Sequence, residues 1–153
     1  MVLKVCEDKV SLGKAAAEQA AVAMRSAVRE RGRARIVAAS AASQFQFLDA
    51  LTQIRDVPWK QVELFHLDEY IGLPMTHSAS FCKFLHEHLI DKVGITNLHL
   101  MNGAGDPAKV IRSANDAVTS APSTLPSSAS GKTVTSRSTI LRRISRQRNH
   151  SWL

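Results

Sequence analysis

Two short segments of the chain carry residue types that could do chemistry. The first is residues 68–74, Asp-Glu-Tyr-Ile-Gly-Leu-Pro, which directly follow the apolar run at 62–67. Paired acids at the carboxyl end of a strand suit general acid–base work on a substrate, so Asp68 and Glu69 are candidate groups for such work. A solvated acidic loop would carry the same residues, and the spacing alone leaves both interpretations open.

The second segment is residues 39–44, Ala-Ser-Ala-Ala-Ser-Gln, which lies between an expected strand and an expected helix. The small side chains of Ser40, Ala41, Ala42 and Ser43 let a ligand approach the backbone, and the N-terminus of a helix favours a phosphate. An ordinary strand-to-helix turn with Ser43 as the N-cap accounts equally for this sequence. Both interpretations remain open at this point.

The histidines and cysteines offer weaker signals. His86 and His88 are two residues apart, so on a helix they point to different sides and cannot bind one metal together. No metal site is therefore expected. His77 is expected to be structural, and Cys82, on a helix without an evident base partner, is expected in the core rather than as a nucleophile.

These residues must be positioned by alternating strands and helices. Apolar runs predict strands at 3–6, 35–39, 62–67 and 98–101. Helices are predicted at 12–31, 44–54, 80–94 and 106–120, with Ser11, Ser43 and Ser80 at three of the starts and Gly32 and Gly94 as stops. This alternation predicts an α/β fold, a partial doubly wound and mostly parallel sheet with flanking helices.

Length and composition exclude several classes of protein. With 153 residues, of which 44% are hydrophobic and 22% charged, the chain fits one globular domain. No stretch approaches the roughly 20 apolar residues of a membrane helix, and the first residues show no signal-peptide pattern. The two cysteines form no disulfide framework. We therefore expect a cytoplasmic protein without a membrane partner.

The positive charge is concentrated at one end. The formal net charge is +7, yet residues 123–153 hold six Lys and Arg side chains and no acid, while residues 1–122 are close to neutral. Residues 120–130 are rich in Ser, Ala and Pro and show no periodicity. At face value this predicts a disordered basic tail. A non-enzymatic binding module that uses this basic arm on nucleic acid is one alternative function.

The segment 65–74, Phe-His-Leu-Asp-Glu-Tyr-Ile-Gly-Leu-Pro, is followed by His77, Ser80-Phe81 and Phe84-Leu85. Together these residues resemble the signature of the glucosamine-6-phosphate deaminase (isomerase) family, and Leu-His-Leu-Met-Asn-Gly at 98–103 resembles its next strand and loop. The resemblance covers roughly residues 3–122. Related lactonases typically carry Asp-Glu-Arg where residues 68–70 are Asp-Glu-Tyr, which favours the deaminase branch over a phosphosugar lactonase or isomerase of the same fold.

The resemblance implies conversion of glucosamine 6-phosphate and water to fructose 6-phosphate and ammonia, without a cofactor. It implies that Asp68 is the base that moves a proton between C1 and C2, that Glu69, Tyr70 and Gly72 form its supporting loop, and that residues 40–43 bind the phosphate. The family usually has Thr-Gly or Gly-Gly in that turn, where this chain has Ser40-Ala41. The resemblance also implies a phosphosugar partner, no nucleic acid, and a homo-oligomer for intact members.

The family pattern continues with a strand, a glycine loop that holds a ring-opening histidine, and a further half domain, none of which matches residues 123–153. If one base was lost near Pro122, the shifted frame can spell Val-Asp-Val-Ala-Phe-(Leu/Ile/Val)-Gly-Ile-Gly-Glu-Asn-Gly-His from residues 122–135. This string supplies the missing strand and loop in order. We therefore expect residues 1–122 to be the N-terminal part of a truncated deaminase-like domain, residues 123–153 to be out of frame, and the chain as given to have little or no activity.

Overall fold

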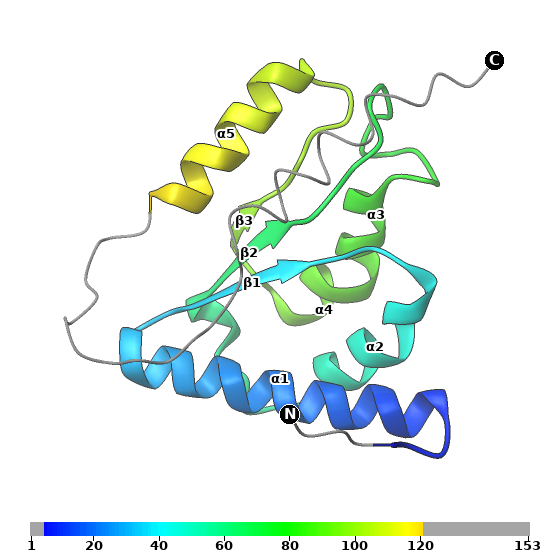
Figure 1. Ribbon diagram of the computed structural model, residues 1–153, viewed down its shortest axis with the longest axis vertical. Helices are drawn as coiled ribbons and strands as arrows, with labels where there is room; N and C mark the ends of the chain where they lie inside the picture. The colour runs from blue at the N-terminus through cyan, green and yellow to red at the C-terminus, as the bar shows by residue number, and fades with distance from the viewer. Residues whose placement is uncertain (1–4, 121–153) are drawn as a thin grey trace.

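The computed structural model describes residues 5–120, and its centre is a parallel sheet of three strands (Figure 1). The strands are β1 (Ala34–Ala38), β2 (Val62–His66) and β3 (Asn97–His99), in the order β1-β2-β3. Helices pack on both faces of the sheet, which confirms the predicted α/β class. The predicted disordered tail at 123–153 lies outside the described residues.

Helix α1 (Lys9–Arg31) begins earlier than the sequence suggested. Asp8, not Ser11, is its N-cap, so the predicted cap is wrong. Asp8 accepts a hydrogen bond from the Ser11 backbone N–H at 2.7 Å, and Ser11 Oγ in turn accepts one from the Asp8 backbone N–H at 3.2 Å. This reciprocal capping box satisfies donors that the helix start would otherwise leave unpaired. Gly32 ends the helix in the left-handed conformation, at φ +72°, as predicted.

The next helix also starts differently. A 3-10 turn, η1 (Ala42–Gln44), leads into α2 (Phe45–Gln53), and no side chain caps either element. The predicted N-cap role of Ser43 is therefore wrong, because Ser43 already lies inside the 3-10 turn. Of the strand predicted at 3–6, the structure describes only Val5 and Cys6, and neither residue lies in a strand. The other two residues lie outside the described range.

The third predicted helix is divided into three consecutive parts. They are α3 (Phe81–Leu85), a π-helical segment η3 (His86–Ile90) and α4 (Asp91–Val93). Ser80 is its N-cap, accepting from the Lys83 backbone N–H, and Gly94 ends it at φ +69°, both as predicted. The remaining elements are η2 (Trp59–Gln61) and α5 (Pro107–Thr119), which Asp106 caps.

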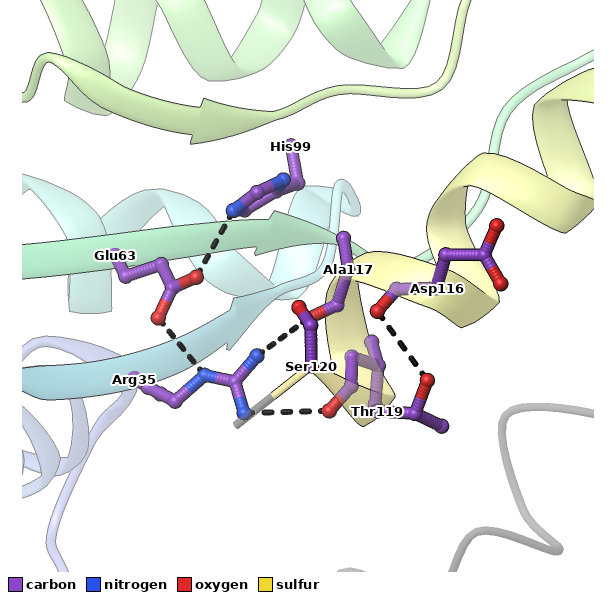
Figure 2. A network of polar contacts seen from close by, with 8 residues as sticks. Arg35, Glu63, His99, Asp116, Ala117, Thr119 and Ser120 are labelled. Atoms are coloured by element: carbon purple, nitrogen blue, oxygen red, sulfur yellow. Dashed lines mark hydrogen bonds and ion pairs between the residues drawn. The ribbon is translucent and has the colours of Figure 1, made fainter. Parts of the chain in front are cut away.

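The two faces of the sheet differ in chemistry. On one face, alternate strand residues such as Ala34, Val62 and Leu64 pack with apolar side chains of α1, α2, α3 and η3 to form the core. The other face carries Arg35 and Glu63 and is approached by α5 (Figure 2). No residue of α5 is fully buried, and Arg35 donates to two carbonyls at the carboxyl end of the helix.

A search of the described residues for membrane-spanning helices finds no helix with the length and apolar character that a bilayer crossing requires.

Candidate active site

The two candidate segments leave the sheet side by side. Ala38 pairs with His66 at the carboxyl ends of β1 and β2, and the Leu67 backbone N–H donates to the Ala38 carbonyl at 3.0 Å. Ser40 and Asp68 each follow that pair by two residues. The sheet therefore positions the small-residue turn and the acidic loop as neighbours at its carboxyl edge, where ligands bind in open α/β sheets.

The start of α3 joins these two loops through one residue. The Phe81 backbone N–H donates to Glu69 Oε1 at 3.0 Å, and the Phe81 carbonyl accepts from Ser40 Oγ at 3.3 Å. Ser40 is buried and its hydroxyl hydrogen is used in this contact. The outward-facing part of the predicted phosphate turn is thus Ala41, Ala42 and Ser43, which are exposed.

Glu69 is a structural organiser of the acidic loop. Its carboxylate accepts hydrogen bonds from the Tyr70, Phe81 and Cys82 backbone N–H groups and from Ser80 Oγ, all between 2.8 and 3.0 Å. Burial alone would raise the pKa of Glu69, but the hydrogen bonds outweigh burial and hold the pKa below its ordinary value. Glu69 is therefore a carboxylate held in place by four hydrogen bonds.

Asp68 is placed differently from its neighbour. Its carboxylate is half-buried, forms no hydrogen bond with any residue in the described range 5–120, and lines a pocket of about 750 Å³. Residues 68–71, the loop after β3 and the first turns of α5 form the walls of this pocket. Residues 40–43 do not line it, so the structure brings the acidic loop to the pocket but not the predicted phosphate turn.

Two glycines hold the acidic loop against the loop after β3. Gly72 has φ +85°, which favours glycine, and its backbone N–H donates to the Gly103 carbonyl at 2.7 Å. A Cβ atom on Gly103 would collide with the carbonyl oxygens of Tyr70 and Leu73. The loop carrying Asp68 is therefore supported from two sides, by Glu69 within the loop and by Gly103 across from it.

Three side chains beneath the loop could in principle hold a metal. His66, Glu69 and Cys82 each bring one potential ligand atom to within 4.8 Å of the others, and all three are buried. Glu69 already accepts four hydrogen bonds, and burial, with Glu69 nearby, raises the pKa of Cys82 to about 12. Burial also lowers the pKa of His66, against the charges of Glu69 and Asp68. This set fits a packed polar core better than a metal centre.

Sequence reasoning missed several residues of the pocket. Met101 and Asn102 follow β3, and Arg112 and Asn115 face the pocket from α5. The position of Asn102 after a strand was a usable signal, since neighbouring strand ends in a parallel sheet share one edge. Arg112 carried no such signal, because only the packing of α5 brings it near Asp68.

Fold and site together define an α/β domain with an acid-bearing crevice at the carboxyl ends of parallel strands. Residues 7–136 of this chain match the family model described as "Glucosamine-6-phosphate isomerases/6-phosphogluconolactonase". The chain belongs to this family, whose members are enzymes of carbohydrate metabolism.

Individual relatives agree with this placement. Glucosamine-6-phosphate deaminase 1 of Giardia intestinalis is 43% identical over 61 residues, covering 39% of this chain and 23% of the relative. The deaminase of Hahella chejuensis is 38% identical over 68 residues, covering 43% and 26%. A putative 6-phosphogluconolactonase from Neisseria gonorrhoeae superposes with a TM-score of 0.64 at 26% identity, covering 71% of this chain and 49% of that one. The matches thus span about a quarter of the length of the two deaminases and about half of the Neisseria gonorrhoeae protein.

Proposed function

We propose that residues 5–120 carry the proton-transfer part of a glucosamine-6-phosphate deaminase site, with Asp68 as the base. The observation that carries the proposal is the contrast between the two acids of the loop. Glu69 accepts four hydrogen bonds and fixes the backbone, while Asp68 has no hydrogen-bond partner among residues 5–120 and lines the pocket. A carboxylate held at a strand end can reach two adjacent carbons of one substrate, as an aldose–ketose proton shuttle requires.

The phosphate end of the substrate is assigned to the turn at 40–43. The first N–H groups of a helical segment lack intrahelical partners, and the turn η1 begins at Ala42. The backbone of this exposed turn could therefore contact a phosphate, with Ser43 Oγ beside it. Because Ser40 Oγ donates to Phe81, we assign Ser40 a positioning role in the turn and not a direct contact to phosphate.

Catalysis by the chain as given is expected to be weak. By its resemblance to the family, the ring-opening histidine would lie in the strand and loop that the shifted frame after Pro122 spells. Loss of one acid–base group typically costs about 10²–10⁴-fold in rate. We propose that the 153-residue chain alone shows little or no deamination and that a frame-restored chain is active.

The test compares four proteins by ammonia release from glucosamine 6-phosphate. They are the chain as given, the frame-restored chain, and the restored chain with Asp68→Asn or with the control Asp56→Asn, whose side chain is exposed and contacts Arg25. We expect activity only in the restored chain and its Asp56→Asn variant, with the Asp68→Asn loss in kcat and not in KM. Near-normal turnover by Asp68→Asn would remove Asp68 from the role of base.

Hydrolysis of 6-phosphogluconolactone is the second candidate activity. The similarity to the Neisseria gonorrhoeae protein supports it. Tyr70 argues for the deaminase, because related lactonases typically carry arginine after the Asp-Glu pair. Assaying the restored chain with both substrates separates the two activities, and preferred turnover of the lactone would overturn the deaminase assignment.

A further inference from the structure

The turn at 40–43, the proposed contact for the phosphate, has few side-chain contacts of its own. Residues 41–43 are small and exposed, and no side chain caps η1 or α2. The Gln44 N–H donates to the Ala41 carbonyl at 2.9 Å and so closes the turn. Exposed segments with few packed side chains open at a low cost in free energy. The geometry of this turn therefore depends on contacts at its two ends.

The amino end of the turn is fixed to the start of α3. Ser40 is buried, and its Oγ donates to the Phe81 carbonyl at 3.3 Å. Phe81 is the first residue of α3, and its N–H donates to Glu69 Oε1 at 3.0 Å. The start of α3 is therefore a common support for the turn and for the loop that carries Asp68.

The carboxyl end of the turn is fixed by three aromatic rings. Phe45 is the first residue of α2, and its ring centroid lies 5.2 Å from that of Phe84 and 4.8 Å from that of His88. The rings of Phe84 and His88 lie 4.6 Å apart, so each ring contacts the other two. Both contacts of Phe45 are edge-on, an arrangement that aromatic pairs favour. We call these three residues the aromatic clamp.

The two attachment points lie on one side of the helix that α3 and η3 form. Phe81, Phe84 and His88 are three and four residues apart, and residues with this spacing share one face of a helix. Phe84 and His88 remain in contact although the helix changes from α to π at His86. Both ends of the turn therefore rest on one face of one helix, whose residue spacing sets the distance between them.

Phe45 is not a core residue. It is 42% exposed and belongs to neither apolar cluster that the described residues 5–120 form around the sheet. Its ring can therefore be removed with little loss of core packing. A substitution at this position tests the turn and not the fold.

We propose that Phe45, Phe84 and His88 are positioning residues for the phosphate turn. The hydrogen bond of Ser40 fixes one end of the turn and the aromatic clamp fixes the other, so the backbone N–H groups between them keep one orientation. Fixing a segment in its binding conformation lowers the entropy cost of binding. The inference rests on the proposed assignment of the phosphate to this turn, and it gives the clamp no contact with the substrate.

Hydrogen exchange in the full 153-residue chain tests whether the clamp holds the turn. Phe45→Ala should speed exchange of the Gln44 amide about two- to tenfold, the range expected for lost aromatic pairs. The Cys82 amide, which donates to Glu69, should exchange as in the unmodified chain. The control Met75→Ala removes a side chain of similar exposure, 39% against 42%, and should leave the Gln44 amide unchanged.

Two results of this experiment would overturn the proposal. Unchanged exchange of the Gln44 amide in Phe45→Ala would show that the clamp does not hold the turn. Faster exchange of both the Gln44 and the Cys82 amides would show that Phe45 supports the fold as a whole and has no specific role at the turn.

Substitutions of His88 test whether an aromatic ring is what the clamp requires. His88→Phe keeps a ring beside Phe45, so the Gln44 amide should exchange as in the unmodified chain. His88→Ala removes the ring and should speed this exchange as Phe45→Ala does. Equal exchange rates in the two His88 variants would show that aromatic contacts do not fix the turn, and would overturn the proposal.

Titration with inorganic phosphate separates the positioning role from the phosphate assignment. At constant ionic strength, the amide NMR signals of residues 41–43 should shift and saturate in the unmodified chain. Phe45→Ala should bind phosphate about two- to tenfold more weakly, and Met75→Ala should bind it as before. No saturable shift in the unmodified chain would overturn the phosphate assignment and the positioning role with it. Equal affinities of the unmodified chain and Phe45→Ala would overturn the positioning role alone.

Discussion

Ser80 Oγ donates a hydrogen bond to Glu69 Oε2 at 2.8 Å, and this contact lies almost entirely out of water because Ser80 is 2% and Glu69 is 8% exposed. Ser80 is also the N-cap of α3, so one hydroxyl serves both the helix start and the acidic loop. The loop that carries Asp68 and the helix that begins at Phe81 are therefore one structural unit, and replacing the Glu69 carboxylate should affect both.

Glu69→Gln should destabilise the fold. The amide has one acceptor oxygen where the carboxylate has two, and its NH₂ group would face backbone donors. Leaving buried donors unpaired costs about 1–3 kcal/mol in the free energy of unfolding, which urea titration measures. The control Glu87→Gln changes an exposed residue that is 3.8 Å from Lys83, and its effect should stay within about 0.5 kcal/mol. Equal effects of the two substitutions would contradict the assigned role of Glu69.

The effect of Glu69→Gln on the free energy of unfolding should depend on pH. The pKa of Glu69 is lower in the folded chain than its ordinary value of 4.5, so the unfolded chain takes up a proton first as pH falls. The stability that Glu69 contributes is fully present above about pH 4.5 and is lost as pH falls through the lower folded pKa. The difference in unfolding free energy between wild type and Glu69→Gln should therefore shrink in acid. If the difference in unfolding free energy grows below pH 4.5, the pKa of Glu69 is raised in the folded chain and not lowered.

Cys82 should resist alkylation in the folded chain. Its side chain is fully buried, its Sγ lies 3.0 Å from the Met101 carbonyl, and its pKa is raised to about 12, so almost no thiolate is present at pH 8. Cys6 is half-buried and provides the internal comparison. Iodoacetamide followed by mass spectrometry should label Cys6 in the native chain and both cysteines in urea. Equal native rates would show that Cys82 is accessible.

Gly103→Ala should displace the acidic loop. The added Cβ would meet the Tyr70 and Leu73 carbonyl oxygens, which are backbone atoms and cannot move without moving the loop. We expect a loss of about 1–3 kcal/mol, the usual cost of overpacking. At Gly105 the nearest atom to an added Cβ is a side-chain methyl group of Val110 at 3.1 Å, so Gly105→Ala is the milder control. Matching urea midpoints for the two variants would disprove the close contact at Gly103.

Arg35→Lys should loosen α5. The guanidinium pairs through Nε with Glu63 Oε2 at 2.8 Å while its other nitrogens reach two carbonyls of α5. An ammonium group cannot form this forked arrangement. Amide exchange in α5 should therefore speed up, while exchange in β2 changes little. Arg25→Lys, at the exposed pair with Asp56, should leave α5 unchanged. Unchanged α5 exchange in Arg35→Lys would show that other contacts hold the helix.

Local signals predicted much of this fold, because they act within a few residues. Ser80 as an N-cap and Gly94 as a stop follow from short-range chemistry, and both were predicted from the sequence. Ser11 was misassigned as a cap because both partners of a capping box are polar residues, and only the backbone shows that Asp8 lies outside the helix. Ser43 was misassigned because the 3-10 turn begins at Ala42, one residue before the predicted cap.

The candidate site was predictable in part. The sequence predicted that Asp68 and Glu69 follow a strand, but it did not predict that Glu69 would be bound by four hydrogen bonds while Asp68 lines the pocket. Three of the four hydrogen bonds of Glu69 come from residues 80–82. The loop at 70–79 separates them from Glu69, and the sequence did not predict how that loop folds back. The contacts of Arg35 and Glu63 were likewise missed, because charged residues in strands gave no indication of which helix they would meet.

The contacts between Arg35 and the end of α5 join residues 82 and 83 positions apart in the chain. No residue of α5 is fully buried, and a helix of 13 residues is marginal in water as an isolated peptide. During synthesis, β1 leaves the ribosome long before the residues that its guanidinium will bind. These contacts close a long loop, so we expect the docking of α5 onto the sheet to be a late step in folding, after β1 and β2 have been synthesised.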